Sequence, residues 1–319
     1  MSRDRVALGS FLAIAAAVGF LASDYQLFQF TLTAAYAMAI LGLNLVMGFN
    51  GQVSLGHGAF YACGAYCTAI LMSRYGVPYW ATLPASALIC AALGFLVGLP
   101  ALRLGGLYLA LTTFALAVAT PQVLKYNAIE GWTGGVQGLV ISKPDQPLGL
   151  PLDPDQWLYF FTLGIAAGAF VVTRNLLRGR IGRALVAIRD HATAAEAMGI
   201  DIALFKTRAF ATSAMLTGVA GSLGAIAVQF VSPDSFTEFL SITLFVGAVV
   251  GGVASVSGAV AGAAFVEFVP NLADEVSKAA PGAVYGAILI GFLFLMPSGA
   301  AGAMRTLARL LRRKRGGLP

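Results

Sequence analysis

Charged residues are scarce in this chain. Of its 319 residues, 11% are charged and 58% are apolar, and the mean hydropathy is +0.82. A soluble domain of this size needs a charged surface, and ordinary soluble proteins carry about 25% charged residues. The scarcity argues against a soluble enzyme, a nucleic-acid-binding protein and a disordered protein. It predicts an all-α membrane protein, a helical bundle that crosses the bilayer several times.

Cysteine, histidine and catalytic motifs are also rare or missing. The three cysteines (Cys63, Cys67 and Cys90) lie in apolar runs, which suits small packing residues rather than a disulfide framework or a zinc site. The sequence contains no HExxH motif, no paired aspartates within an apolar run and no nucleophile elbow. An intramembrane protease or hydrolase therefore has no visible machinery. The net charge of +6 fits basic cytoplasmic loops better than nucleic-acid binding.

Long uncharged apolar runs are what the sequence has instead. A spanning helix needs about 20 mostly apolar residues. The first run, 6–22, follows Arg3 and Arg5 without a convincing cleavage site, so we expect an uncleaved helix rather than a signal peptide. The run 25–73 is long enough for two spans broken near Asn50-Gly51. The remaining runs are 77–99, 104–124, 157–173, 209–231, 239–266 and 279–296.

Basic residues decide how often the run 239–266 crosses. The loop 174–208 holds seven Lys/Arg against three acids, and the segment 305–315 holds six basic residues and no acid, so both should be cytoplasmic. Only two crossings within 239–266 keep them on the same side, so we expect a break near 253–256. This gives about ten spans in one domain, 1–319, with both termini cytoplasmic. The outer loop is then 125–156, and the basic cytoplasmic tail is 298–319.

Small residues recur four apart in several runs, which predicts close helix–helix packing. The dense glycine run 247–262 also suits a bend that lines a cavity. The pairs are Gly94/Gly98, Gly164/Gly168, Gly247/Gly251, Gly258/Gly262 and Gly282/Gly286.

The apolar runs contain no ionisable residue in mid-span, apart from His57 near the start of one. Carriers driven by ions or protons usually keep such a residue as a relay, so we expect the energy to come from elsewhere. A pathway would then be polar and uncharged. His57 is either a substrate contact or a structural histidine, and each other candidate either lines the pathway or bonds neighbouring helices. These candidates are Thr33, Asn44, Asn50, Gln52, Ser54, Thr112 and Thr113.

The cytoplasmic loop has the pattern of a docking element. Residues 183–201 predict one short amphipathic helix that ends at Gly199, with Arg189 and Glu196 on a second face. Its apolar stripe, formed by Leu185, Ile188, Ala192 and Ala195, is weak for a helix lying on lipid. A small-faced helix of mixed charge better suits a groove on a partner protein, which would also supply energy.

Several segments together resemble one family of transport permeases. AIRDHATAAEAMGID (187–201) resembles the coupling "EAA" region of ABC-importer permeases, and LGLNLVMGFNGQVSLGHGAFYACGAY (41–66) resembles a signature of branched-chain amino acid permeases. RLGGLYLALTTFALA (103–117) and TGGVQGL (133–139) are similar to the LivM-type subunit rather than the LivH-type. GGVASVSGAVAGA (251–263) also matches. Val136 and Gln137 depart from the family's usual TGGSxG or TGGxNG.

The resemblance implies a transport subunit of a heteromeric importer in the bacterial inner membrane, not an enzyme. Its partners would be a LivH-type permease, two cytoplasmic ATPases and a periplasmic or lipoprotein binding protein. ATP and Mg would bind the ATPases, and this chain would hold no cofactor. The expected ATPase-coupling residues are Arg183, Arg189, Asp190, Ala195, Glu196, Ala197 and Gly199.

The sequence leaves open which substrate is transported and to which class of membrane protein the chain belongs. Branched-chain or related amino acids fit an uncharged pathway, but urea or a short amide fits it equally. An ATP-independent carrier or channel would need no coupling helix. An integral membrane enzyme lacks a catalytic constellation here, and a membrane anchor for a cytoplasmic complex would show no substrate flux.

Overall fold

Two helices, α2 (Asp24–Asn44) and α10 (Ile202–Val228), form the centre of the bundle in the computed structural model. The structure describes residues 17–101, 106–144, 151–278 and 280–306. α10 packs on α3 (His57–Tyr75), α4 (Tyr79–Ala101) and α2, while α2 also packs on α7 (Pro154–Arg178) and α12 (Gly258–Val276). Both central helices are apolar around most of their circumference, and such helices are buried on all sides.

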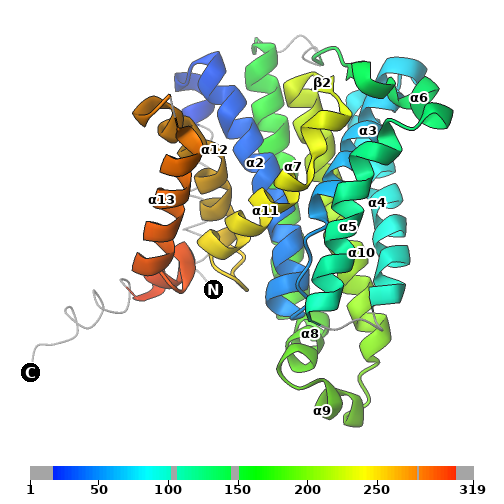
Figure 1. Ribbon diagram of the computed structural model, residues 1–319, viewed down its shortest axis with the longest axis vertical. Helices are drawn as coiled ribbons and strands as arrows, with labels where there is room; N and C mark the ends of the chain where they lie inside the picture. The colour runs from blue at the N-terminus through cyan, green and yellow to red at the C-terminus, as the bar shows by residue number, and fades with distance from the viewer. Residues whose placement is uncertain (1–16, 102–105, 145–150, 279, 307–319) are drawn as a thin grey trace, which may run out of the picture.

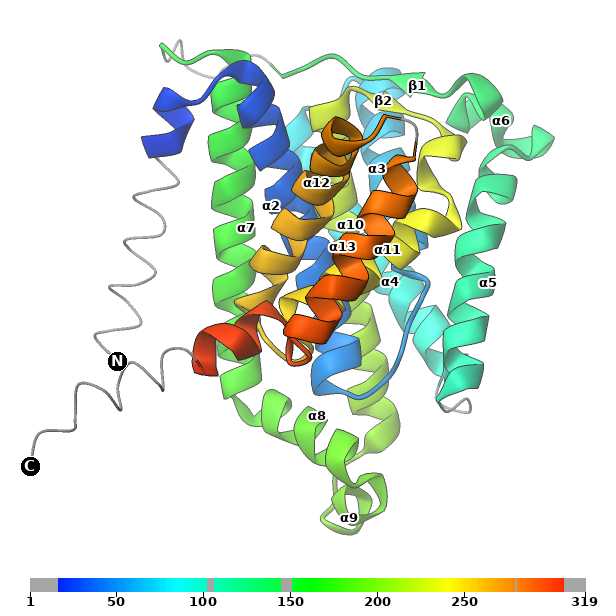
Figure 2. The ribbon, with the colours of Figure 1, turned by 60° about the vertical axis from the view of Figure 1, so that its left-hand side comes forward.

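The other helices surround this pair (Figure 1). α5 (Leu107–Leu124) and α13 (Pro281–Leu295) lie at opposite sides of the view, and α11 (Glu238–Gly251) crosses between them. A short helix, α6 (Asn127–Thr133), and the paired strands β1 (Leu139–Val140) and β2 (Phe230–Val231) lie at one end. At the opposite end, α8 (Arg180–Asp190) and α9 (Ala192–Ala197) project from the bundle (Figure 2).

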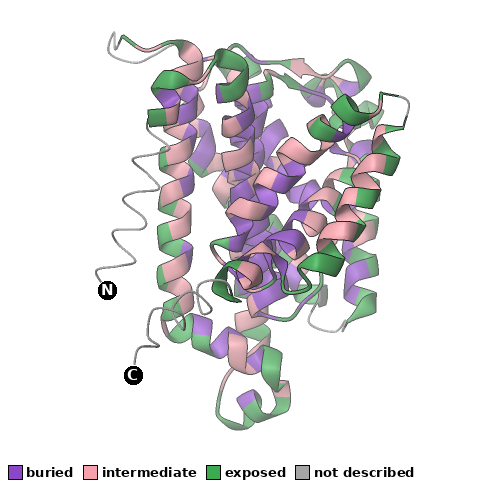
Figure 3. Ribbon diagram, turned by 90° about the vertical axis from the view of Figure 1, so that its left-hand side faces the viewer, coloured by how far each residue is buried: buried purple, intermediate pink, exposed green. Residues whose placement is uncertain are grey.

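The chain is a multi-pass helical membrane protein. Buried residues concentrate between the helices, and the outward faces are exposed (Figure 3). On α13 the exposed side chains include Phe294 and Leu295, 85% and 83% exposed, which suits contact with lipid or a partner helix. Among the described residues, seven helical segments are long and apolar enough to span a bilayer: Asp24–Phe49, Tyr79–Pro100, Leu107–Leu124, Pro154–Arg178, Ile202–Val228, Pro233–Gly251 and Pro281–Thr306.

The expected total of ten spans, with both termini cytoplasmic, stays a prediction. Most of the first run, 6–22, and the tail beyond residue 306 lie outside the described residues. α3 and α12 are helices of 19 residues each but are not among the seven apolar spans.

The two expected breaks are present. α2 continues into a π-helical turn (Leu45–Phe49), after which a non-helical segment leads to α3 at His57. α11 ends at Gly251 and α12 begins at Gly258, so the chain breaks where 239–266 was expected to divide. Within this second break Ala254 has a φ of 60°, a left-handed conformation that non-glycine residues seldom adopt.

Three of the five glycine pairs make close helix contacts. Gly94 and Gly98 face α10, while Gly247 meets Gly262 and Gly251 meets Gly258 so closely that a Cβ would overlap the opposing backbone. The contacts join α4 to α10 and α11 to α12, as small residues at helix interfaces permit. The pairs Gly164/Gly168 and Gly282/Gly286 have nothing within 4 Å of an added Cβ, so they pack on nothing in the described part of this chain.

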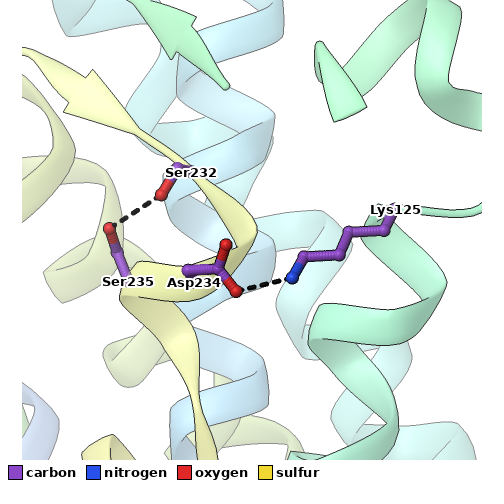
Figure 4. A network of polar contacts seen from close by, with 4 residues as sticks. All are labelled: Lys125, Ser232, Asp234 and Ser235. Carbon is purple, nitrogen blue, oxygen red and sulfur yellow. Dashed lines mark hydrogen bonds and ion pairs between the residues drawn. The ribbon is translucent and has the colours of Figure 1, made fainter. Parts of the chain in front are cut away.

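At the end that carries β1 and β2, an ion pair joins two distant segments. Lys125, just after α5, reaches Asp234 in the 3-10 turn (Pro233–Phe236) before α11, with 2.5 Å between Nζ and Oδ1 (Figure 4). In the same turn the hydroxyl oxygens of Ser232 and Ser235 lie 3.2 Å apart. The ion pair therefore bridges the end of α5 and the turn before α11.

Candidate functional site

The segment expected to dock on a partner is two helices, not one. The expectation of a single helix over 183–201 is wrong, because the chain is extended at His191, with φ −157° and ψ 92°. α8 ends at Asp190 and α9 starts at Ala192. Since the helix is interrupted, Arg189 and Glu196 do not share a continuous helical face.

α8 is anchored to the bundle by its apolar face. Leu185 is 1% exposed and clusters with Leu45 of the π-helical turn and Ala209 of α10. Gly182 lies so close to the carbonyl of Leu177 that a Cβ would overlap it. The absence of a side chain at Gly182 therefore lets α8 turn tightly away from the end of α7. The contacts of Leu185 fix the position of α8 against the π-helical turn and α10.

α9 forms the exposed tip. Gly199 has a φ of 80°, its amide donates to the Glu196 carbonyl at 2.9 Å, and the Ile200 amide donates to the Ala195 carbonyl at 3.1 Å. A left-handed glycine that closes a helix in this way is typical of a C-terminal cap. Glu196, Gly199 and the start of α10 line an open hollow of about 410 Å³.

Of the expected coupling residues, all but Ala195 are exposed. Arg183, Asp190, Glu196, Ala197 and Gly199 are exposed around the α8–α9 tip, while Ala195 is buried. Their exposure leaves them accessible to a partner.

Arg189 is exposed too, but its side chain also reaches the bundle. Its Nη1 donates a hydrogen bond to the carbonyl oxygen of Gly48 at 2.9 Å, and its side-chain carbons lie against Gly51. It also pairs with the neighbouring Asp190 at 2.8 Å. The π-helical turn that contains Gly48 is a type of helix distortion found often at functional sites. Sequence reasoning placed Arg189 on the docking helix but missed this contact, because no local pattern encodes it.

The same turn contacts the break between α11 and α12. The backbone at Gly48 lies against Ala254, where a Cβ on residue 48 would overlap the Ala254 nitrogen. The Asn44 side-chain amide donates to the Ser255 carbonyl at 3.3 Å, and Asn44 is fully buried. Arg189, the π-helical turn and this second break therefore form one continuous set of contacts.

His57 is buried in a hydroxyl network and is 1% exposed. Its Nε2 lies 2.6 Å from the Ser213 hydroxyl, which in turn donates to the Gly42 carbonyl at 2.5 Å. Because Ser213 has a single proton, this arrangement assigns the His57 proton to Nε2. Nδ1 then accepts from the Ser54 hydroxyl at 3.0 Å. The geometry is that of a satisfied structural histidine joining the start of α3 to α10.

Most of the other polar candidates surround the segment between the π-helical turn and α3. Asn50 donates to Gln52 at 2.6 Å, and the Leu55 amide donates to Thr113 of α5 at 2.9 Å. Asn50, Gln52, Arg189 and Lys206 help to line a second hollow of about 190 Å³. The Oδ1 atoms of Asn44 and Asn50 are buried and have no hydrogen-bond partner in the described part of the chain. Six of the eight candidates thus meet here: Asn44, Asn50, Gln52, Ser54, His57 and Thr113.

The remaining two candidates lie elsewhere. Thr33 sits on the far half of α2 and donates to the Gln29 carbonyl of its own helix at 2.8 Å. Thr112 is exposed on α5 and donates to the Tyr108 carbonyl at 2.9 Å. Neither hydroxyl joins the cluster near the π-helical turn.

A carboxylate that sequence reasoning missed lies on α12. The expectation covered the apolar runs alone, and Glu267 lies one residue beyond the run 239–266, as the tenth of the 19 residues of α12. The apolar run stops at Val266, but the helix continues to Val276, since polar residues on one helix face do not end a helix. Among the described residues no cluster of three or more potential metal ligands is present.

The described part of the chain therefore combines a multi-pass helical bundle, a projecting α8–α9 pair and polar contacts that join them. The family model described as "branched-chain amino acid transport system / permease component" matches residues 25–296. The chain belongs to this permease family. The match covers every element from α2 to α13.

Related proteins agree with this assignment of the permease. It is 35% identical over 274 residues to the high-affinity branched-chain amino acid transport permeases LivM of Salmonella typhimurium and of Escherichia coli. These alignments cover 79% of this chain, which spans 64% of the length of either relative. It is also 27% identical to a probable LivH permease of Methanocaldococcus jannaschii, over 85% of this chain and 90% of that protein. No solved structure matches the permease.

Proposed function

We propose that this chain is the membrane-spanning permease subunit of an ATP-driven importer for branched-chain amino acids. The observation that carries the proposal is the α8–α9 pair, which presents exposed residues outside the bundle and reaches into it through Arg189. A subunit that moved solute alone would need no such projecting element. The family membership and the LivM and LivH relatives support the same function.

The proposed assembly has five protein chains. This chain pairs with a second, LivH-type permease, and substrate passes between the two. A periplasmic or lipoprotein binding protein delivers substrate at the end that carries α6, β1 and β2. Two cytoplasmic ATPases dock at the opposite end, one of them on α8 and α9. ATP and Mg bind the ATPases, and no cofactor binds this chain.

The proposed topology has ten spans in the inner membrane with both termini in the cytoplasm. The segment 174–208, which contains α8 and α9, carries seven Lys/Arg, which favours the cytoplasm for both helices. The helical residues after α13, up to Thr306, lie toward that same end, as Figure 2 shows. This arrangement leaves the 125–156 segment on the outer side.

The transport cycle follows from a two-state bundle. ATP binding draws the ATPases together and displaces the α8–α9 pair. The displacement biases the bundle between inward-open and outward-open states, since a ligand shifts such an equilibrium only by its different affinity for the two.

The test is uptake by the complete importer in vesicles. Glu196→Lys reverses a charge at the α9 tip, and Gly199→Val forces a branched residue into a left-handed conformation. Each variant should reach the membrane in normal amounts but lose ATPase binding and uptake. Normal leucine uptake by both variants would refute the docking role. ATP-independent uptake by the chain alone would make it a carrier or channel, and transport of urea in place of leucine would reassign the substrate.

A further inference from the structure

The smaller hollow, of about 190 Å³, has charge of one sign on its walls. Its lining comes from the start of α5, the segment after the π-helical turn, α8 and α10, and it lies at the end from which α8 projects (Figure 1). Lys206 of α10 and Arg189 of α8 are among the described residues that line it, and no Asp or Glu is among them. A hollow lined by positive charge alone attracts anions.

Lys206 has no acid to balance its charge. It is half-buried in the second turn of α10, and it forms no ion pair or hydrogen bond with any residue that the structure describes. Taking an ammonium group partly out of water is costly unless an acceptor accompanies it. All three of its N–H groups are therefore available to a ligand.

Arg189 adds two further donors to the hollow. Its Nε and Nη2 lie 2.9 and 2.8 Å from the Asp190 carboxylate, and its Nη1 donates to the Gly48 carbonyl at 2.9 Å. These bonds use three of the five N–H groups of a guanidinium, so two stay available. Since Asp190 balances the charge of Arg189, the uncompensated charge is that of Lys206, and the hollow suits a ligand with one negative charge rather than two.

Uncharged donors complete the lining. Gln52 is 7% exposed, and its Oε1 accepts from Asn50 at 2.6 Å, whereas its Nε2 donates to no group in the described part of the chain. Gly106 precedes α5 and provides no side-chain cap, so the first amides of this helix have no partner within it. The positive end of the α5 dipole also favours an anion. Donors from four elements therefore line one hollow.

We propose that this hollow binds a singly charged oxyanion between Lys206, Arg189 and Gln52. In the proposed topology it faces the cytoplasm, where two sources exist. One is the carboxylate of the amino acid that the importer releases, and the other is the phosphodiester of an anionic lipid in the inner leaflet. Only the first source rests on the proposed function.

The rest of the lining favours an organic anion over free phosphate. Leu109 of α5 and Ile188 of α8 add apolar surface to the hollow. A bound oxyanion also bridges α8 and α10 beside the bond from Arg189 to Gly48, so it adds to the contacts that fix the position of α8.

The experiment titrates the complete importer, purified in a neutral detergent, and follows its thermal unfolding midpoint at constant ionic strength set with chloride. A ligand that binds only the folded protein raises the midpoint. The probes are acetate, leucine, leucinamide, which lacks the carboxylate, and a short-chain phosphatidylglycerol. Lys206→Gln should weaken the apparent affinity for acetate about 10- to 100-fold, the range of a lost charged hydrogen bond. The effect of leucinamide should be the same in this variant and in the wild type.

Two further variants make the test independent of one substitution. Gln52→Glu keeps an acceptor for Asn50 and places a carboxylate in the hollow, so it should abolish the acetate-induced rise. Lys278→Gln is the matched control, because it makes the same change as Lys206→Gln at an exposed lysine just after α12. It should leave the affinity for acetate unchanged.

The outcomes separate the two sources and the proposed function. A Lys206-dependent rise with leucine but not with phosphatidylglycerol assigns the site to the amino acid, and the reverse assigns it to the lipid. No rise with any of the three anions, or a rise that survives both Lys206→Gln and Gln52→Glu, would overturn the proposal. Wild-type uptake tests the proposed function by itself. If the importer takes up no leucine, the amino acid is lost as a source, and the site then stands or falls on phosphatidylglycerol.

Discussion

Arg189 of α8 donates a hydrogen bond to the carbonyl of Gly48, 141 residues away in sequence, at 2.9 Å. The bond joins a helix that projects from the bundle to a π-helical turn inside it. That turn also contacts Ala254 and, through Asn44, Ser255 in the break between α11 and α12. Movement of α8 therefore has a continuous set of contacts that leads into two transmembrane segments.

Arg189→Ala should uncouple ATP hydrolysis from transport. Losing a hydrogen bond to a charged donor costs about 1.5–3 kcal/mol, so leucine uptake per ATP hydrolysed should fall roughly tenfold or more. The measurement is uptake and ATPase rate on the same reconstituted complex. Arg180→Ala is the control, since Arg180 is an exposed arginine of α8 with no partner among the described residues. An unchanged uptake-to-ATPase ratio in Arg189→Ala would remove this contact from the coupling route.

Gly48→Ala should destabilise the protein. The added Cβ would overlap the Ala254 backbone nitrogen, and overpacking of this kind costs about 1–3 kcal/mol. The measurement is the thermal unfolding midpoint of the purified protein, which should be lower in Gly48→Ala than in the wild type. Gly164→Ala is the matched control, because a Cβ there meets nothing within 4 Å in the middle of α7. Its midpoint should stay the same or rise, since alanine favours helix. Equal midpoints for the two variants would contradict the close approach of Gly48 to Ala254.

Ser213→Ala should lower stability more than Ser54→Ala. Ser213 both accepts from His57 Nε2 and donates to the Gly42 carbonyl, so its loss leaves a buried donor and a buried acceptor unpaired. Ser54 donates to His57 Nδ1 at 3.0 Å and accepts only a longer bond, 3.4 Å, from the Gly56 amide, so its loss leaves mainly the His57 acceptor without a partner. The expected costs are about 2–4 kcal/mol for Ser213→Ala and about half of that for Ser54→Ala. Thermal unfolding of the two variants measures the order, and the reverse order would show the opposite histidine tautomer.

The Lys125–Asp234 ion pair should contribute little to stability. The two side chains are 27% and 63% exposed, and pairs of this kind contribute about 0–1 kcal/mol. In a double-mutant cycle of Lys125→Ala and Asp234→Ala, the interaction energy from unfolding should be below about 1 kcal/mol and should fall further in high salt. A larger, salt-independent coupling would mean that the pair is buried in the assembled protein.

Sequence patterns were sufficient to predict the features that depend on neighbouring residues or on the composition of a long segment. Apolar runs bounded by charges located the helices, because crossing a bilayer requires both length and hydrophobicity. The distribution of basic residues predicted the break between α11 and α12, since only two crossings within 239–266 keep both basic segments on one side of the membrane. The motifs between residues 41 and 263 indicated the family that the match over residues 25–296 shows.

Other features depended on segments far apart in sequence, and only the tertiary structure decided them. His191 divides α8 from α9, although the apolar stripe is continuous in sequence. The chain turns there because Leu185 of α8 is buried against the bundle, whereas α9 lies at the exposed tip. The hydrogen bond from Arg189 to Gly48 depends on how α8 docks on the bundle. Glu267 lay outside every apolar run, yet helical continuation places it in the middle of α12. Hydropathy is a sum over residues that are adjacent in sequence. A contact between helices depends on which faces of the helices pack together, and only the tertiary structure determines that.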